Sequence, residues 1–150
     1  MCGGDWPPRF TLGGAIAAIR PPPSTTERSP WSLGGRLIFH DLGGRGSVVT
    51  HAMYISDSPL SAEGMFRLRV LEWVVKIHED GDLTKPATES PVWVTISLKQ
   101  IPIDRSDSVM YELEMPVKAE VGDYGIIGRR VSVWSRRGRE PLSEGIAGFN

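Results

Sequence analysis

The sequence predicts an all-β fold, built as an antiparallel β-sandwich, a jelly roll or a partly closed barrel. Several short stretches alternate apolar and polar side chains, which is the pattern of strands that bury one face. Turns rich in Gly, Pro and Asp separate these stretches. No stretch of the sequence sustains the 3.6-residue period of an amphipathic helix. The chain has 150 residues, which is enough for one domain with its own core.

Six strands are expected from this alternation. The odd-numbered residues of 47–55 should share one face, and in 91–103 the apolar face changes side after Leu98. Pro116 indicates an edge position or an irregularity, because proline cannot donate to a ladder. The expected strands are 36–42, 47–55, 66–77, 91–103, 108–121 and 128–138.

The stretch 66–77 contains a change of phase. Its apolar residues occupy even positions up to Val70 and odd positions from Leu71 onward. A strand of strict period two cannot bury both sets. We therefore expect a bulge or bend near Val70–Leu71, of the kind found where a strand passes from one sheet to another.

The beginning of the chain differs from the rest. Ten of its 29 glycines and prolines fall within residues 1–30, where they prevent much regular structure. We expect an irregular N-terminal arm over 1–30, a β domain over 31–140 that folds without it, and a short C-terminal tail over 141–150. Apolar side chains are of little use in a solvated tail, so the arm is expected to pack on a neighbouring copy. The expected assembly residues are Trp6, Phe10 and Ile16.

The segment 78–82, HEDGD, allows two interpretations. His78, Glu79, Asp80 and Asp82 are residue types that bind metals, but a calcium loop needs further acidic ligands at set distances, which this stretch lacks. Asp80-Gly81 between two alternating stretches is a strong hairpin signal. We therefore expect a turn.

The sequence offers no motif for catalysis or for a cofactor. The histidines lack metal-ligand spacing, no G-x-S-x-G elbow or P-loop is present, and Cys2 has no base fixed beside it. We expect no catalytic residue, no metal, no cofactor and no small-molecule substrate. An enzyme whose site is assembled across strands is the least supported alternative, and its candidate residues are His40, Asp41, His51 and His78.

Charge is unevenly distributed although the formal net charge is −1. Residues 76–128 carry ten acidic and five basic residues, while 129–139 carry five arginines and no acid. Arginine favours bidentate contacts with phosphate or carboxylate, so this cluster is a candidate contact for an anionic membrane surface, a nucleic-acid backbone or an acidic patch of another copy. A solubilising strand edge is the alternative. The cluster consists of Arg129, Arg130, Arg136, Arg137 and Arg139.

The remaining expectations concern location and function. One cysteine excludes an intrachain disulfide, no secretory signal is visible, and the apolar run 15–19 is too short to span a bilayer, so we expect an intracellular (cytoplasmic) or virion location. We expect a non-enzymatic structural or assembly protein that forms homo-oligomers. The alternative is a β-sandwich binding module for a peptide, glycan or lipid headgroup, with Trp93 as its platform because it is out of phase with the buried residues around it.

Overall fold

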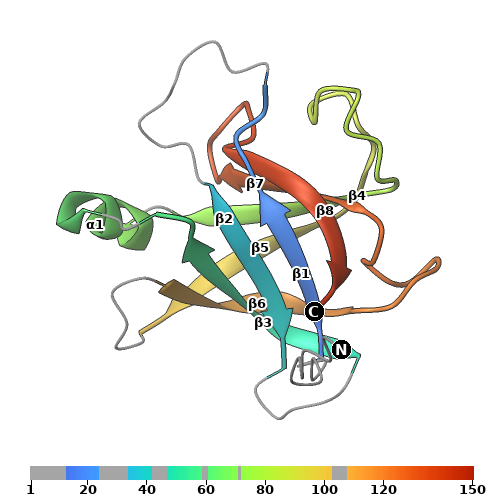
Figure 1. The fold of residues 1–150 in the computed structure, drawn as a ribbon, viewed down its shortest axis with the longest axis horizontal. Helices are drawn as coiled ribbons and strands as arrows, with labels where there is room; N and C mark the ends of the chain where they lie inside the picture. Colours follow the sequence, from blue (N-terminus) through green and yellow to red (C-terminus); the bar gives the residue numbers. More distant parts are fainter. Residues whose placement is uncertain (1–12, 24–33, 42–46, 59–60, 71, 103–107) are drawn as a thin grey trace, which may run out of the picture.

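The computed structural model of the chain is a closed barrel of eight antiparallel strands with one short helix (Figure 1). Around the barrel the strands follow the order β1-β2-β3-β6-β5-β4-β7-β8, and β8 pairs with β1 to close the ring. The prediction of an all-β fold is confirmed, in its barrel form. The structure describes residues 13–23, 34–41, 47–58, 61–70, 72–102 and 108–150.

Eight strands and a helix make up the regular structure of the described residues. In chain order they are β1 (Ala15–Ile19), β2 (Gly35–His40), β3 (Val48–Ser56), α1 (Ala62–Val70), β4 (Trp73–His78), β5 (Val92–Ile101), β6 (Ser108–Lys118), β7 (Arg130–Ser135) and β8 (Ser143–Phe149).

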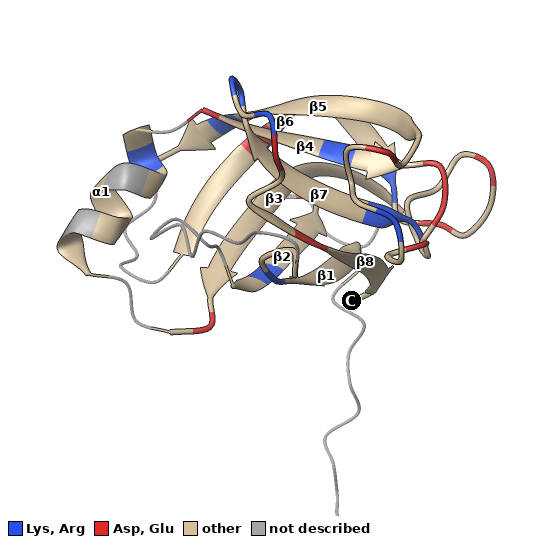
Figure 2. Ribbon diagram, turned by 90° about the horizontal axis from the view of Figure 1, so that it is seen from above, with Lys and Arg blue, Asp and Glu red and all other residues tan. Residues whose placement is uncertain are grey.

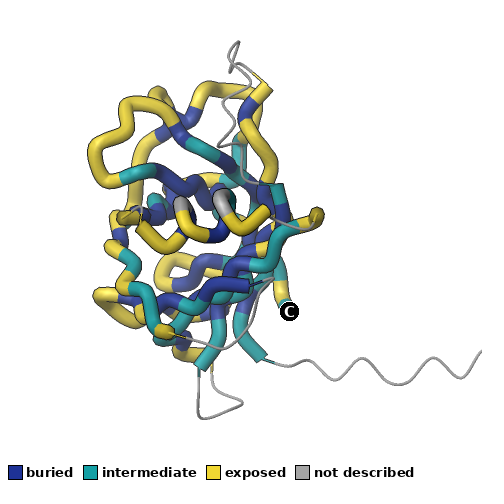
Figure 3. Tube along the Cα trace, turned by 90° about the vertical axis from the view of Figure 1, so that its left-hand side faces the viewer, coloured by how far each residue is buried: buried dark blue, intermediate teal, exposed yellow. Residues whose placement is uncertain are grey.

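Two connections cross the barrel because β4, β5 and β6 are inserted in reverse order between β3 and β7. The first, between β3 and β4, carries α1 across one end of the barrel (Figure 3), where Met65 and Leu68 turn inward and are buried. The second, residues 119–129, passes the other end and buries Ile126 completely. The two connections thus help to close both ends of the core.

The core fills the inside of the barrel, and alternate residues of each strand point into it. In β3 the register shifts between Val49 and His51, so the inward side passes from Val49 to Ala52 and Tyr54. The expectation that the odd residues of 47–55 share one face is therefore wrong, because this bulge exchanges the faces. The buried strand residues are Ala15, Ala17, Ile19, Leu37, Phe39, Val49, Ala52, Tyr54, Trp73, Val75, Ile77, Ile96, Val109, Tyr111, Leu113, Val117, Val131, Val133 and Ala147.

The expected boundaries of the β domain need correction at both ends. Residues 15–19, assigned to an irregular arm, form β1, and residues 143–149, assigned to a tail, form β8. Both segments are rich in alanine and glycine, so their apolar alternation is weak, yet small residues suit the tight interior of an eight-stranded barrel. Residues 1–12, with Trp6 and Phe10, lie outside the described residues.

The stretch 66–77 is a helix followed by a strand, so the prediction of one bulged strand is wrong. The change of phase falls where α1 ends and before β4 begins. Met65 and Leu68, three positions apart, share the buried side of α1, whereas Phe66 and Val70 are exposed. The alternation over residues 66–70 was too short to distinguish a strand from a helix.

The hairpin expected at Asp80-Gly81 joins the correct strands, since β4 and β5 are antiparallel neighbours. Its connection is long, however, and covers residues 79–91. Gly81 has no positive φ; a side chain there would place its Cβ 2.4 Å from the carbonyl oxygen of Gly128. Close packing against the 119–129 connection, not turn geometry, therefore requires glycine at this position.

Among the described residues, α1 is the only helix, and it is neither long nor apolar enough to cross a membrane.

The place of β1 in the barrel yields a test of the domain boundary. Deletion of residues 1–12 should leave the thermal transition nearly unchanged at low protein concentration, because every described core residue remains. Deletion of residues 1–23 removes β1 and both of its ladders. We expect that shortened chain to be unfolded, because the stabilisation that β1 provides should exceed the free energy of unfolding of about 5–15 kcal/mol that is typical of a domain. Circular dichroism on heating measures both. Equal melting temperatures for the two deletions would contradict the assignment of β1 to the core.

Candidate functional site

The cavity described inside the barrel is too small for a ligand. The space left between Leu68 of α1 and the strand residues beneath it is a cavity of about 10 Å³, enough for at most one water molecule. Tyr111 lines this cavity, and burial raises the pKa of its phenol above the ordinary value.

A buried network of hydrogen-bonded polar side chains covers the outer side of β4 and β7. The Ser132 hydroxyl lies 2.7 Å from Nε2 of His78, a distance typical of a nucleophile and its base. Trp134 Nε1 donates to the same hydroxyl oxygen at 2.7 Å, and His78 Nδ1 lies 3.2 Å from the Ser90 carbonyl oxygen. All of these hydrogen bonds form together if His78 is neutral and carries its proton on Nδ1. Desolvation by burial lowers the pKa of His78, which favours this neutral form.

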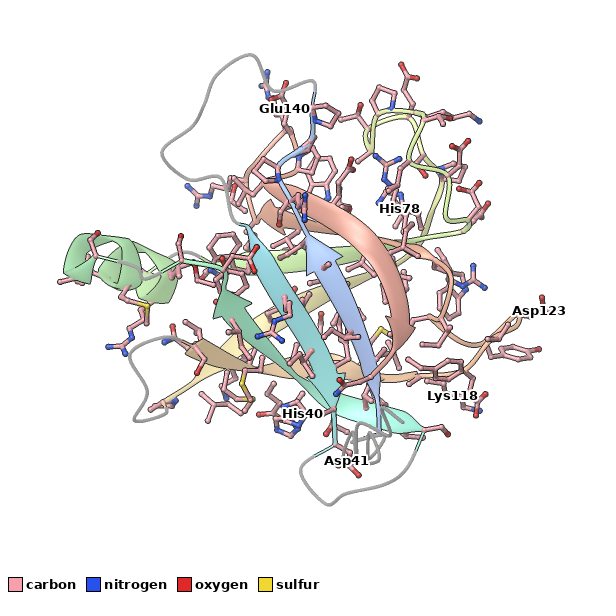
Figure 4. All side chains as sticks on the ribbon, in the orientation of Figure 1. His40, Asp41, His78, Lys118, Asp123 and Glu140 are labelled. Carbon is pink, nitrogen blue, oxygen red and sulfur yellow. The ribbon has the colours of Figure 1, made fainter. Side chains whose placement is uncertain are left out.

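The Ser132–His78 pair is structural in this arrangement. Both residues have no exposed surface, and Trp134 is 5% exposed, so no substrate can approach the hydroxyl. The hydrogen bond to Ser90 joins the 79–91 connection to the sheet. Figure 4 places His78 beside this connection and away from His40, at the end of β2. Of the four residues considered for an enzyme site, His40, Asp41 and His51 thus lie together at one end of β2 and β3, and His78 lies apart from them.

Arg130 forms a second buried link on the same side. It is 1% exposed and pairs through Nε and Nη2 with the Glu144 carboxylate on β8. Its Nη1 donates to the carbonyl oxygens of Asp82 at 3.0 Å and Lys85 at 2.7 Å. One guanidinium therefore holds β7, β8 and the 79–91 connection together. A groove of about 300 Å³ lies above this pair, with Pro22, Pro23, Pro86 and Pro141 among its walls.

The structure separates the arginine cluster into different roles. Arg130 is buried and cannot reach an external anion, so that part of the prediction is wrong. Arg136 pairs with Glu72 at 2.9 Å, both largely exposed. Arg137 and Arg139 are exposed in the β7–β8 turn, and no described residue bonds them. An anion contact by these last three remains a prediction.

Arg129 and Trp93 form a contact that changes the expected role of Trp93. The guanidinium carbon of Arg129 lies 4.3 Å from the centre of the Trp93 ring. Arg129 also donates to the carbonyl oxygens of Glu79 and Gly125, both at 2.7 Å. One face of Trp93 is therefore occupied by its own chain, and the side chain is 37% exposed. This arrangement offers only part of the ring as a ligand platform.

An apolar row runs across the outside of five neighbouring strands. Each of its members is the register partner of the next, from β1 through β2, β3 and β6 to β5. All are half-buried and point away from the core. Figure 2 shows charge gathered mainly in the loops, and β1 contains no charged residue. The apolar row consists of Ile16, Ile38, Met53, Met110 and Ile101.

Histidines border the apolar row on the side nearer the 40–47 connection. His40 and His51 are register partners whose rings stack at 6.0 Å, and Nε2 of His40 lies 3.3 Å from Sδ of Met110 in the row. Desolvation lowers the pKa of His40. No group of three or more His, Cys, Asp or Glu side chains within the described ranges could hold a metal ion.

Sequence reasoning did not find the apolar row, because each strand contributes one member and single outward apolar residues are common. Only Ile16 had been singled out, as part of the arm; the structure places it on β1, at one end of the row. Only the register of the paired strands shows that the five residues of the apolar row lie next to one another.

No protein-family model matches this chain, and no curated protein matches it either.

The buried ion pair can be compared with the exposed one. Glu144→Gln leaves the Arg130 guanidinium buried without its counter-charge, so we expect the free energy of unfolding to fall by about 3 kcal/mol. The matched control, Glu72→Gln, breaks the exposed Arg136–Glu72 pair and should change it by less than about 1 kcal/mol. Urea unfolding measures both, and similar losses for the two variants would contradict the role given to Arg130.

The buried histidine predicts a loss of stability in acid. Because the pKa of His78 in the folded chain lies below its ordinary value of 6.5, the unfolded chain takes up this proton first. The contribution of neutral His78 to the free energy of unfolding is therefore present above pH 6.5 and is lost as the pH drops below it. The His40 pKa is lowered as well, so the comparison with His78→Gln isolates His78. Melting temperatures between about pH 7.5 and pH 5 should fall more steeply for the natural chain than for the variant. Parallel slopes would exclude this contribution.

Proposed function

We propose that the protein is a non-enzymatic structural subunit, of the coat, matrix or scaffold type, whose copies associate through the apolar row. The row itself is the observation that carries this proposal. A strand face exposed to water normally alternates polar residues outward, yet five Ile and Met side chains lie here in register on the outside. A contiguous apolar surface of this kind is typical of an interaction site.

The other parts of the barrel support a role without chemistry. The interior cavity of about 10 Å³ is too small for a substrate. The Ser132–His78 pair, the described contact closest to a catalytic arrangement, has no exposed surface. The groove above Arg130 has a floor whose charges are paired with each other.

Charged residues provide a second, weaker contribution to association. Glu120 and Asp123 lie in the connection before β7, and the exposed Arg136, Arg137 and Arg139 lie in the turn after it. Opposite charges at the two ends of one strand can bring copies together, and salt screens this attraction. Burial of the apolar row is not screened, so association should weaken but persist as salt is raised.

A charge placed in the apolar row tests the proposal. Met53 lies at the middle of the row, and Met53→Glu would bury a carboxylate in the contact. We expect its dissociation constant for self-association to rise at least about 100-fold, which equals about 2.7 kcal/mol. Sedimentation velocity over a concentration series measures it, and Ile38→Glu provides a second variant of the same row.

The matched control is Thr95→Glu, which adds the same charge to an exposed, outward position on β5, opposite Lys76 and outside the row. It should associate like the natural chain. A natural chain that remains monomeric at high concentration, or a Met53→Glu chain that associates as the control does, would refute the proposal.

A further inference from the structure

We infer that the apolar row receives residues 1–12 of a neighbouring copy, so that subunits are joined by exchanged N-terminal segments. This inference rests on the proposed self-association and names the partner of the same surface. Three properties support it: the curvature of the row, the length of residues 1–12, and their composition.

The curvature of the row favours a narrow partner over a flat one. Its five members come from five of the eight strands of a closed barrel, and the four steps between them bend around about half of the circumference. A rigid face of a second barrel touches only the few strands nearest to it. A single chain segment can follow the bend and reach all five.

The length of residues 1–12 is sufficient for this path. Four inter-strand steps of about 4.8 Å separate Ile16 from Ile101, a path of roughly 19 Å along the row. Twelve residues span up to about 40 Å when extended. The segment is therefore about twice as long as the row.

The composition of residues 1–12 suits the row. They include Trp6, Phe10 and Leu12, and aromatic rings make favourable contacts with the thioether of methionine, of which the row has two. Pro7 and Pro8 have no backbone N–H, so this segment is a poor candidate for an added strand. A closed barrel also has no free edge to extend. Side-chain docking on the outer face fits both facts.

Gly13 and Gly14, which join residues 1–12 to β1, contact both neighbours of that strand. Gly13 and Gly14 have φ angles of 77° and 82°, and they precede β1 directly. The C-terminal residue Asn150 donates to the carbonyl oxygens of both, from its side chain to Gly13 at 3.5 Å and from its backbone to Gly14 at 3.4 Å. Gly14 also packs against β2, because a Cβ at this position would lie 2.0 Å from the carbonyl oxygen of Phe39. The assignment to a neighbouring copy therefore comes from the proposed self-association, and docking of the segment on its own barrel is an outcome of the test.

The experiment mixes two full-length variants that lack complementary parts. The arm variant, Trp6→Ala with Phe10→Ala, keeps the row, and the row variant, Met53→Glu, keeps the segment. We expect each to be monomeric alone in sedimentation velocity and the mixture to form a one-to-one heterodimer. Because that heterodimer has one of the two exchanged contacts, the mixture is measured at the highest concentration the proteins allow.

Binding of the isolated segment provides the second measurement. A fluorescently labelled peptide of residues 1–12 should bind the arm variant at least about 100-fold more tightly than the row variant, by fluorescence anisotropy. The same peptide with Trp6→Ala and Phe10→Ala is the matched control and should bind neither.

The outcomes separate this inference from the proposed function. If the arm variant self-associates like the natural chain, the inference is wrong and the apolar row meets another surface. If both variants are monomeric, their mixture stays monomeric and the peptide does not bind, exchange between copies is refuted. If the natural chain is itself monomeric, both proposals fail together.

Discussion

Closure of the barrel by β1 is the constraint on which the rest of the structure depends. This five-residue strand pairs on one side with β2 and on the other with β8, and so joins the beginning of the chain to its end. Ala15 and Ala17 are fully buried, and Ile19 is 1% exposed. Without β1, both neighbouring strands would have an unpaired edge and the core would be open to water. Asn150 adds a further link, because it bonds the glycines that precede β1.

Polar groups on the outer side of β4, β7 and β8 hold the long 79–91 connection in place. Arg130 binds two of its carbonyl oxygens and the Glu144 carboxylate, and His78 reaches the Ser90 carbonyl. Burying an arginine is costly unless its charge and donors are matched, and here they are matched within the chain. The polar residues of this side are therefore used to hold the fold together, and the proposed contact between copies lies on the opposite side of the barrel.

The proposed interface rests on two features of the chain. Five outward Ile and Met residues lie in register across five strands on that opposite side, and the twelve positions before Gly13 contain aromatic residues. Self-association through exchanged segments would give each copy one row and one partner for it. Such an interface is isologous in a pair and continues from copy to copy if the exchange does not close.

The sequence alone determined the all-β class, the position of most strands and the alternation of buried residues, because these depend on local periodicity. It failed where local signals are weak or double. The small residues of 15–19 and 143–149 gave too weak an alternation to predict β1 and β8. The alternation that ends at Val70 was too short to distinguish a helix from a strand. The apolar row, the Ser132–His78 contact and the burial of Arg130 were decided only by the tertiary structure. Each depends on which strands pair and in what register, and closure of the whole ring sets that pairing across long separations in the chain.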